Sequence, residues 1–463
     1  MAFASNFNIQ VPLKENRALV YNSLSGAMAV LESDEKEILE GLQKDSANEY
    51  TSKILNEFHS AGFMTGDQAD EFSNFEQQYL MHRFDANTLT LTIAPTMACN
   101  FGCDYCFQGK DKPSNGMPQN VQDAIVGLVE QSISSISRLH ITWYGGEPLI
   151  KYSIIKDLSE RIIRICDTHS VEYDSMIVTN GYLLDPDTAR SLAGYRIYSA
   201  QITLDGSRNT HDATRATLSG APSFDRILQN AKQIIQADIP IRFSVRVNVD
   251  IRNQDEITRL FDELVQYKLT HTNRFQIYFA PIEALTKFCA ASADVSLEKS
   301  IYGKLEVEYI EKAIQLGLSG HPLPPRFRGS CAAVKPNGFV VTSNGDIYKC
   351  WDAVNSPEKK IGTIFNIEKL TLNTVHQNWL NWSPFNVQMC PNRRLLPSCA
   401  GACAFKFLHD EESNGDASSS PCISWKHNIN ERLVMRAVKQ GFITEQDYAL
   451  EEIETDPNQL NIS

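Results

Sequence analysis

The first 86 residues carry two successive hydrophobic patterns. Alternation of apolar and polar residues predicts three short strands, at 8–13, 17–22 and 27–31. Helical spacing then predicts three helices, whose apolar faces contain Ile38, Leu39, Leu42, Ile54, Leu55, Phe58, Phe72, Phe75 and Tyr79. Ser33 is expected to cap the first helix, and Gly62 to end the second. The sequence therefore predicts a small α+β, winged-helix-like domain at 1–86.

From residue 87 the pattern changes to strands that alternate with amphipathic helices. The predicted strands lie at 89–95, 139–144, 174–179, 198–204, 241–249 and 274–280. Helical patterns fall between them, for example at 121–133, 154–166 and 227–235. Repeated βα units imply an α/β fold with a parallel sheet, in which ligands bind at the carboxyl ends of the strands.

The remainder of the chain is short-stranded and turn-rich. Residues 321–325 have the composition of a linker, 411–421 of a polar loop, and 424–440 the pattern of a closing helix. We therefore divide the chain into three domains, at 1–86, 87–320 and 321–463.

The composition of the chain argues against several classes of function. The formal net charge of −13 over 463 residues argues against a nucleic-acid-binding protein, whose footprint is a basic patch. The N-terminus lacks the basic and apolar regions of a signal peptide, and no apolar run is long enough to span a bilayer. A soluble, cytoplasmic protein is expected. In that compartment eleven cysteines indicate metal or redox sites rather than disulfides.

Three of these cysteines follow the first strand of the predicted parallel sheet. Cys99, Cys103 and Cys106 have the spacing C-x3-C-x2-C. An iron–sulfur cubane is normally held by four thiolates, so a loop with three leaves one iron open to a further ligand. Structural zinc and disulfides are the alternatives, but His82 and His140 are too distant in sequence to suggest a fourth zinc ligand.

With Tyr105 just before the last cysteine, this loop resembles the cluster loop of the radical S-adenosylmethionine (radical SAM) enzymes. The resemblance implies a partial (β/α)6 barrel, a [4Fe-4S] cluster and bound S-adenosylmethionine (SAM). It also implies reductive cleavage of SAM to a 5′-deoxyadenosyl radical that abstracts a substrate hydrogen.

The same resemblance implies SAM contacts at the ends of the next strands. Gly145-Gly146-Glu147-Pro148 follows the second strand and matches the segment that receives the SAM ammonium group. Further candidates on later strands are Asn180, Thr203, Arg215, Arg246 and Asn248. Arg215 or Arg246 would pair with the SAM carboxylate, because a guanidinium suits a planar anion. No residue is singled out by its spacing as a catalytic base.

A second cysteine set lies near the C-terminus, at Cys331, Cys350, Cys390, Cys399, Cys403 and Cys422. With Gly345, this set resembles the SPASM domain, which carries two auxiliary iron–sulfur clusters. The resemblance implies that Cys331, Cys350 and Cys403 hold a nearer cluster, and Cys390, Cys399 and Cys422 a farther one. Arg393 stands where the family has a further cysteine, and arginine cannot ligate iron.

Three thiolates per cluster leave several alternatives open. Another side chain completes the shell, an iron stays open to substrate, or one of the two clusters is smaller or absent. Asp352 and Asp410 are possible oxygen ligands. Structural zinc is a further alternative for this region.

The three N-terminal strands and three helices resemble the PqqD-like domain of peptide-modifying enzymes, in which a leader peptide adds a strand to the sheet. The alternative is a structural cap. We expect a maturase that forms thioether or carbon–carbon crosslinks in a precursor peptide with a leader segment, reduced by a flavodoxin or ferredoxin. The alternatives are an enzyme of the anaerobic sulfatase-maturating type, which generates formylglycine, and a non-catalytic iron–sulfur or zinc scaffold.

Overall fold

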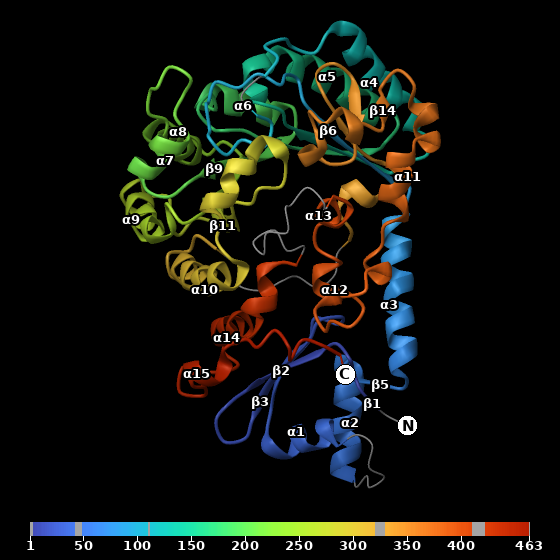
Figure 1. Cartoon of the computed structure of the whole chain (residues 1–463), viewed down its shortest axis with the longest axis vertical. Coiled ribbons are helices and arrows are strands. Elements are labelled where there is room, and N and C mark those ends of the chain that lie inside the picture. The colour runs from blue at the N-terminus through green and yellow to red at the C-terminus, as the bar shows by residue number, and fades with distance from the viewer. Residues whose placement is uncertain (1–2, 42–48, 110–111, 320–328, 410–421, 463) are drawn as a thin grey trace.

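A parallel sheet covered by helices forms the larger part of the molecule (Figure 1). The computed structural model describes residues 3–41, 49–109, 112–319, 329–409 and 422–462. The parallel strands of this part are β6 (Thr88–Ile93), β7 (Arg138–Trp143), β8 (Glu172–Val178), β9 (Ile197–Leu204), β10 (Arg242–Val249) and β11 (Phe275–Pro281). Its helices are α4 (Gln119–Ser132), α5 (Tyr152–Thr168), α6 (Pro186–Gly194), α7 (Arg208–Thr214), α8 (Phe224–Gln236), α9 (Ile257–Gln266) and α10 (Lys299–Gln315).

These strands pair in sequence order and in parallel, as the alternation of strands and helices predicted. Strand β6 shows why the sequence folds this way. Leu89, Leu91 and Ile93 are buried in the core that also contains Val121 and Ile125 of α4, while the intervening threonines are only partly buried. The apolar face of β6 therefore packs against helices, and its threonines lie on the opposite face of the sheet.

The C-terminal part continues the same sheet. It contains β12 (Gly338–Val341), β13 (Asp346–Tyr348), β14 (Gly362–Thr363), α11 (Thr374–Asn381), α12 (Leu396–Cys399), α13 (Ala404–Leu408), α14 (Ile429–Gln440) and α15 (Leu450–Ile453). Strand β12 pairs in parallel with β6, and β13 and β14 follow antiparallel. The sheet therefore runs across the domain boundary that we placed at 320/321. The predicted linker at 321–325 and loop at 411–421 lie outside the described residues.

The N-terminal part has the predicted strands and helices. Its elements are β1 (Phe3–Ala4), β2 (Asn8–Pro12), β3 (Ala18–Asn22), β4 (Met28–Leu31), α1 (Ser33–Glu40), α2 (Glu49–Ala61), β5 (Met64–Thr65) and α3 (Gln68–Arg83). Strands β2, β3 and β4 form an antiparallel sheet. Ser33 is the first residue of α1 and not its cap, because Glu32 and Glu35 form a reciprocal capping box. Gly62 follows α2 with a φ of +79°, as expected of a helix-ending glycine.

Two buried clusters join the N-terminal part to the C-terminal part. Leu19 and Tyr21 of β3 share one core with Leu433 and Val434 of α14. Helix α3 runs from the N-terminal sheet toward α11 (Figure 1). At its end the buried Arg83 donates to the backbone carbonyls of Val334, Trp379, Leu380 and Trp382. In the described part of the chain, no helix is long and apolar enough to cross a membrane.

Candidate functional site

The cysteine loop opens on a cavity of about 440 Å³ at the carboxyl ends of the parallel strands. Cys99, Cys103 and Cys106 all line this cavity. Their side chains are free thiols, as are those of the other eight cysteines. Burial raises the pKa of Cys103 to about 11 and also raises the pKa of Cys99. Cys99 and Cys103 are therefore protonated in the absence of a metal, and a metal would have to displace their protons.

Two cations lie beside these thiols. Burial lowers the pKa of Lys112, but the nearby Cys106 and Cys99 raise it by more, so that its pKa is above the ordinary value. Arg215 acts on both Cys99 and Cys103 and lowers their pKa values. Three thiols on one cavity with nearby positive charge fit the requirements of an anionic iron–sulfur cluster. Among the described residues no three His, Cys, Asp or Glu side chains converge on one metal ion. The thiolates of a cubane bind different irons and stand farther apart than the ligands of one ion.

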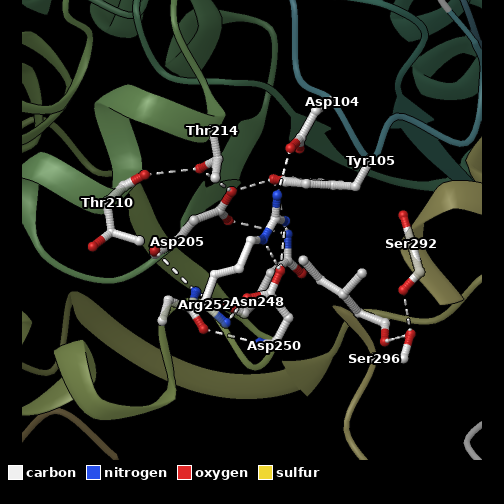
Figure 2. Close-up of polar contacts among 12 residues, drawn as sticks. Asp104, Tyr105, Asp205, Thr210, Thr214, Asn248, Asp250, Arg252, Ser292 and Ser296 are labelled. Carbon is white, nitrogen blue, oxygen red and sulfur yellow. Dashed lines mark hydrogen bonds and ion pairs between the residues drawn. The ribbon is translucent and has the colours of Figure 1, made fainter. Parts of the chain in front are cut away.

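A polar network fixes the cysteine loop to the ends of β9 and β10 (Figure 2). The Tyr105 hydroxyl donates to Asp205 Oδ2 at 2.5 Å and accepts hydrogen bonds from Arg215 and Asn248 at 2.6 and 3.2 Å. Asp205 is 1% exposed, and burial raises its pKa although Arg215 and Tyr105 lower it. Because Tyr105 stands between Cys103 and Cys106, this network positions two of the three thiols.

An ion pair holds the neighbouring residue of the loop. Asp104 lies 2.5 Å from Arg252, which also pairs with Asp250 at 2.5 Å (Figure 2). Both charged partners follow the end of β10, so the loop is tied to the sheet through two adjacent side chains.

The glycines of the Gly145–Pro148 segment approach the cysteine loop at backbone distance. A Cβ on Gly145 would lie 2.3 Å from the Thr96 carbonyl oxygen, and one on Gly146 would lie 2.2 Å from that of Ala98. Gly145 also has a φ of +133°. Only glycine fits at either position. Both glycines line the cavity.

Glu147 lies behind the cavity wall, where its carboxylate binds the end of β8. It accepts hydrogen bonds from Leu149 N, Thr179 Oγ1 and Asn180 N, at 3.0, 2.7 and 2.7 Å. The residue is fully buried, and burial raises its pKa against these hydrogen bonds. Neither Glu147 nor Pro148 lines the cavity. The carboxylate that we expected to face SAM therefore holds the segment against β8 in this structure.

The other candidate SAM contacts reach the cavity from four places. Asn180, Thr203, Arg215, Arg246 and Asn248 all line it. Arg246 donates to Asn248 at 2.7 Å and has no ion-pair partner among the salt bridges of the described residues. Arg215 is committed to Tyr105 and lies over the Phe101 ring, 5.8 Å from its centroid. Of the two arginines, Arg246 is thus the more available for an added anion.

The resemblance divides the C-terminal cysteines into two groups of three. In the nearer group, Cys350 and Cys403 pack against one buried cluster that contains Ala333, two residues after Cys331. Cys390, Cys399 and Cys422 line a second cavity. Arg393 also lines that cavity and donates to the Pro457 carbonyl at 3.2 Å. Asp410 lies outside the described residues.

Several cavity residues escaped the sequence reasoning. Lys112, Tyr144, Glu283, Cys289, Trp351 and Lys406 line the first cavity. Glu283 pairs with Lys406 at 2.5 Å and with Lys299 at 3.2 Å. Glu283 follows β11, the last parallel strand, so the rule that ligands bind at strand ends could have singled it out. Tyr144 stacks on Trp351 with ring centroids 5.0 Å apart, a contact between distant segments that no local pattern predicts.

The central part of the chain matches a known protein family. Residues 93–264 match the family model of the Radical SAM superfamily. The chain is 22% identical over 347 residues to the cysteine-type anaerobic sulfatase-maturating enzyme of Clostridium novyi (strain NT), covering 68% of this chain and 88% of that protein. It is 26% identical over 175 residues to the sporulation killing factor maturation protein SkfB of Bacillus subtilis (strain 168), covering 38% and 39%.

Two solved structures share the fold. Streptococcus suis SuiB bound to the precursor peptide SuiA matches 91% of this chain and all of that chain, with 15% identity and a TM-score of 0.52. The structure of anSMEcpe with bound AdoMet matches 76% of this chain and 97% of that chain, with 17% identity and a TM-score of 0.53. The α/β fold with its parallel sheet is thus that of radical SAM enzymes.

Proposed function

We propose that this radical SAM enzyme modifies a ribosomally made precursor peptide. The observation that carries the proposal is the convergence of Cys99, Cys103 and Cys106 with both glycines of the Gly145–Pro148 segment on one cavity. The family implies a [4Fe-4S] cluster and SAM, and the three thiols of this loop fit the cluster. When bound, the cluster would supply the electron that cleaves SAM to a 5′-deoxyadenosyl radical.

The remaining cavity residues bind and orient SAM in this proposal. Asn180 and Thr203 offer an amide and a hydroxyl to the ribose and methionyl groups. Arg246 offers an unpaired guanidinium to the carboxylate. Arg215 and Glu147 contribute indirectly, because Arg215 hydrogen-bonds to Tyr105 and Glu147 holds the glycine segment against β8.

The primary experiment measures 5′-deoxyadenosine. Anaerobically reconstituted protein, given SAM and dithionite, is expected to form it, and the triple variant Cys99→Ala, Cys103→Ala, Cys106→Ala to form none. The Cys166→Ala variant is the matched control, since Cys166 is buried in helix α5 away from the cavity. No product from the wild-type protein would favour the non-catalytic scaffold.

The N-terminal sheet supports a peptide substrate. Strand β4 is at the edge of this sheet. Asn22 N donates to Ala27 O, so alternation along the ladder directs the main-chain groups of Met28 and Val30 to the open edge. An extended leader peptide could add a strand there. The match to SuiB bound to its precursor peptide covers more of the chain than the match to anSMEcpe, at 91% against 76%.

Val30→Pro tests the leader edge. Proline removes an outward N–H without breaking the β3–β4 ladder. We expect this variant to lose modification of a leader-bearing precursor peptide encoded near its gene, while SAM cleavage without peptide continues. Glu37→Ala, an exposed change on α1, should behave as wild type. Full modification by Val30→Pro would reject β4 as the leader site.

The second candidate is an enzyme of the sulfatase-maturating type, favoured by the 88% coverage of the Clostridium novyi protein. A sulfatase-derived cysteine or serine peptide, analysed by mass spectrometry, distinguishes the two. Formylglycine in that peptide would favour the second candidate. A thioether or carbon–carbon crosslink in a precursor peptide would favour the first. In either case we propose auxiliary clusters on the two C-terminal cysteine groups, and a flavodoxin or ferredoxin as electron donor.

A further inference from the structure

A carboxylate lies within the nearer group of C-terminal cysteines. Asp352 is two residues after Cys350, in a short 3-10 turn over Trp351–Ala353. Its Oδ2 is 3.7 Å from the Cys350 sulfur. Asp352 also lines the first cavity together with Cys403. The side chain is therefore placed between the nearer cysteines and the proposed SAM site.

Packing places the three cysteines in one part of the fold. The side chains of Cys350 and Cys403 pack against one buried cluster that contains Ala333 and Ala353. Cys331 is two residues before Ala333, and Asp352 directly precedes Ala353.

Asp352 lacks a cation at ion-pair distance among the salt bridges of the described residues. Among the described residues, its hydrogen-bond partner is the Cys350 thiol, a weak donor. A partly buried carboxylate without a close cation is unfavourable unless it binds a metal or an added positive group.

The other nearby carboxylate is already paired. Glu283 lines the same cavity, but it is held by Lys406 at 2.5 Å and by Lys299 at 3.2 Å. Three thiols and one unpaired carboxylate match the four ligands that a cubane needs.

We propose that Asp352 is the fourth ligand of the nearer auxiliary cluster, binding through a carboxylate oxygen the iron that Cys331, Cys350 and Cys403 leave open. The inference rests on the proposed auxiliary cluster. In this assignment the fourth iron is bound by a side chain of the protein and is not open to substrate. Oxygen is a harder ligand than thiolate, so the fourth iron would differ from the other three.

Mössbauer spectroscopy of ⁵⁷Fe tests this assignment. The full-length chain is loaded with ⁵⁷Fe after Cys99, Cys103, Cys106, Cys390, Cys399 and Cys422 are changed to Ala, so that only the nearer site remains. We expect about four irons, one of which shows a larger isomer shift than the rest. Asp352→Cys is expected to remove this difference. Asp352→Ala should change the spectrum of the same iron, and added 2-mercaptoethanol should convert it toward that of Asp352→Cys.

Glu283→Gln is the matched control, because it removes a second carboxylate from the same cavity, and its spectrum should equal that of the parent. If the parent variant does not fold, the comparison is made on the fully loaded chain, where Asp352→Cys should alter one iron of about twelve. Identical spectra for the parent variant and for its Asp352→Cys and Asp352→Ala derivatives would overturn the ligand assignment. Absence of iron from the nearer site in both preparations would refute the auxiliary cluster itself. The SAM chemistry of Cys99, Cys103 and Cys106 would be unaffected by that result, because 5′-deoxyadenosine formation tests it separately.

Discussion

At the scale of single residues, the side chains between the cysteines matter as much as the cysteines. Tyr105 and Asp104 carry the contacts that fix the loop on the strand ends. Glu147 does the same for the glycine segment. Asp205 and Glu147 are buried, so removing one of their partners leaves a buried polar group unpaired, which costs about 1–3 kcal/mol.

Tyr105→Phe tests this positioning role. The change removes one hydroxyl that Asp205, Arg215 and Asn248 share. We expect the iron content to stay unchanged and the kcat/KM for SAM cleavage to fall about tenfold, because the network that aligns the loop is disrupted. Rates of 5′-deoxyadenosine formation at varied SAM concentration measure the effect.

Tyr267→Phe is the control for that experiment. It also removes a tyrosine hydroxyl bonded to an aspartate, but Asp225 and this hydrogen bond are exposed at the surface. Equal losses in both variants would mean that Tyr105 has no special role.

At the scale of elements, helix α3 connects the N-terminal sheet to the C-terminal part. Its Arg83 is 1% exposed and donates to backbone carbonyls of the C-terminal part. Deletion of 1–86 would remove this arginine and uncover the core shared by β3 and α14. Point variants such as Val30→Pro therefore test leader recognition more cleanly than a deletion.

Arg83→Leu should destabilise the whole protein. The leucine leaves the carbonyls of Val334, Trp379 and Leu380 without their donor. We expect the free energy of unfolding to fall by about 3 kcal/mol, measured by urea denaturation. Lys53→Ala, on the exposed face of α2, should change it little. A loss below about 0.5 kcal/mol would show that water replaces the guanidinium at no net cost.

Asp447 gives the contact between the two ends of the chain a pH dependence. The hydrogen bond from Arg17, at 2.6 Å, lowers the pKa of Asp447 to about 2. A depressed carboxyl pKa stabilises the folded state above the unfolded pKa of about 4, and this stability is lost as the pH falls toward 2.

Asp447→Asn should therefore be less stable than wild type at pH about 7, with a difference that has become smaller at pH about 3. Urea unfolding of both proteins across this range measures it. A difference that does not depend on pH would mean that the carboxylate charge contributes nothing.

At the scale of the whole molecule, we propose three groups of three cysteines as cluster sites, of which the nearer C-terminal group reaches the first cavity through Cys403. Fully loaded protein should contain about twelve irons if each group holds a cubane. Cys390→Ala with Cys399→Ala should lower this by about four and spare SAM cleavage without peptide. Iron analysis after anaerobic purification measures both. About four irons in the wild-type protein would refute the auxiliary pair.

Local patterns in the sequence determined the strands and helices of this protein. Period-two alternation marks β6, and helical spacing marks α5, because each element must bury one face. The spacing of Cys99, Cys103 and Cys106 likewise indicated the cluster loop. These signals lie within a few residues of one another and need no knowledge of distant contacts.

Only the tertiary structure decided which distant side chains meet. The meeting of Asp352 and Cys403 on one cavity, the hydrogen bond of Glu147 to Asn180 and the pairing of β12 with β6 all join segments far apart in the chain. Such contacts depend on how complete elements pack, and packing is set by the shape of the whole core rather than by any local run of residues.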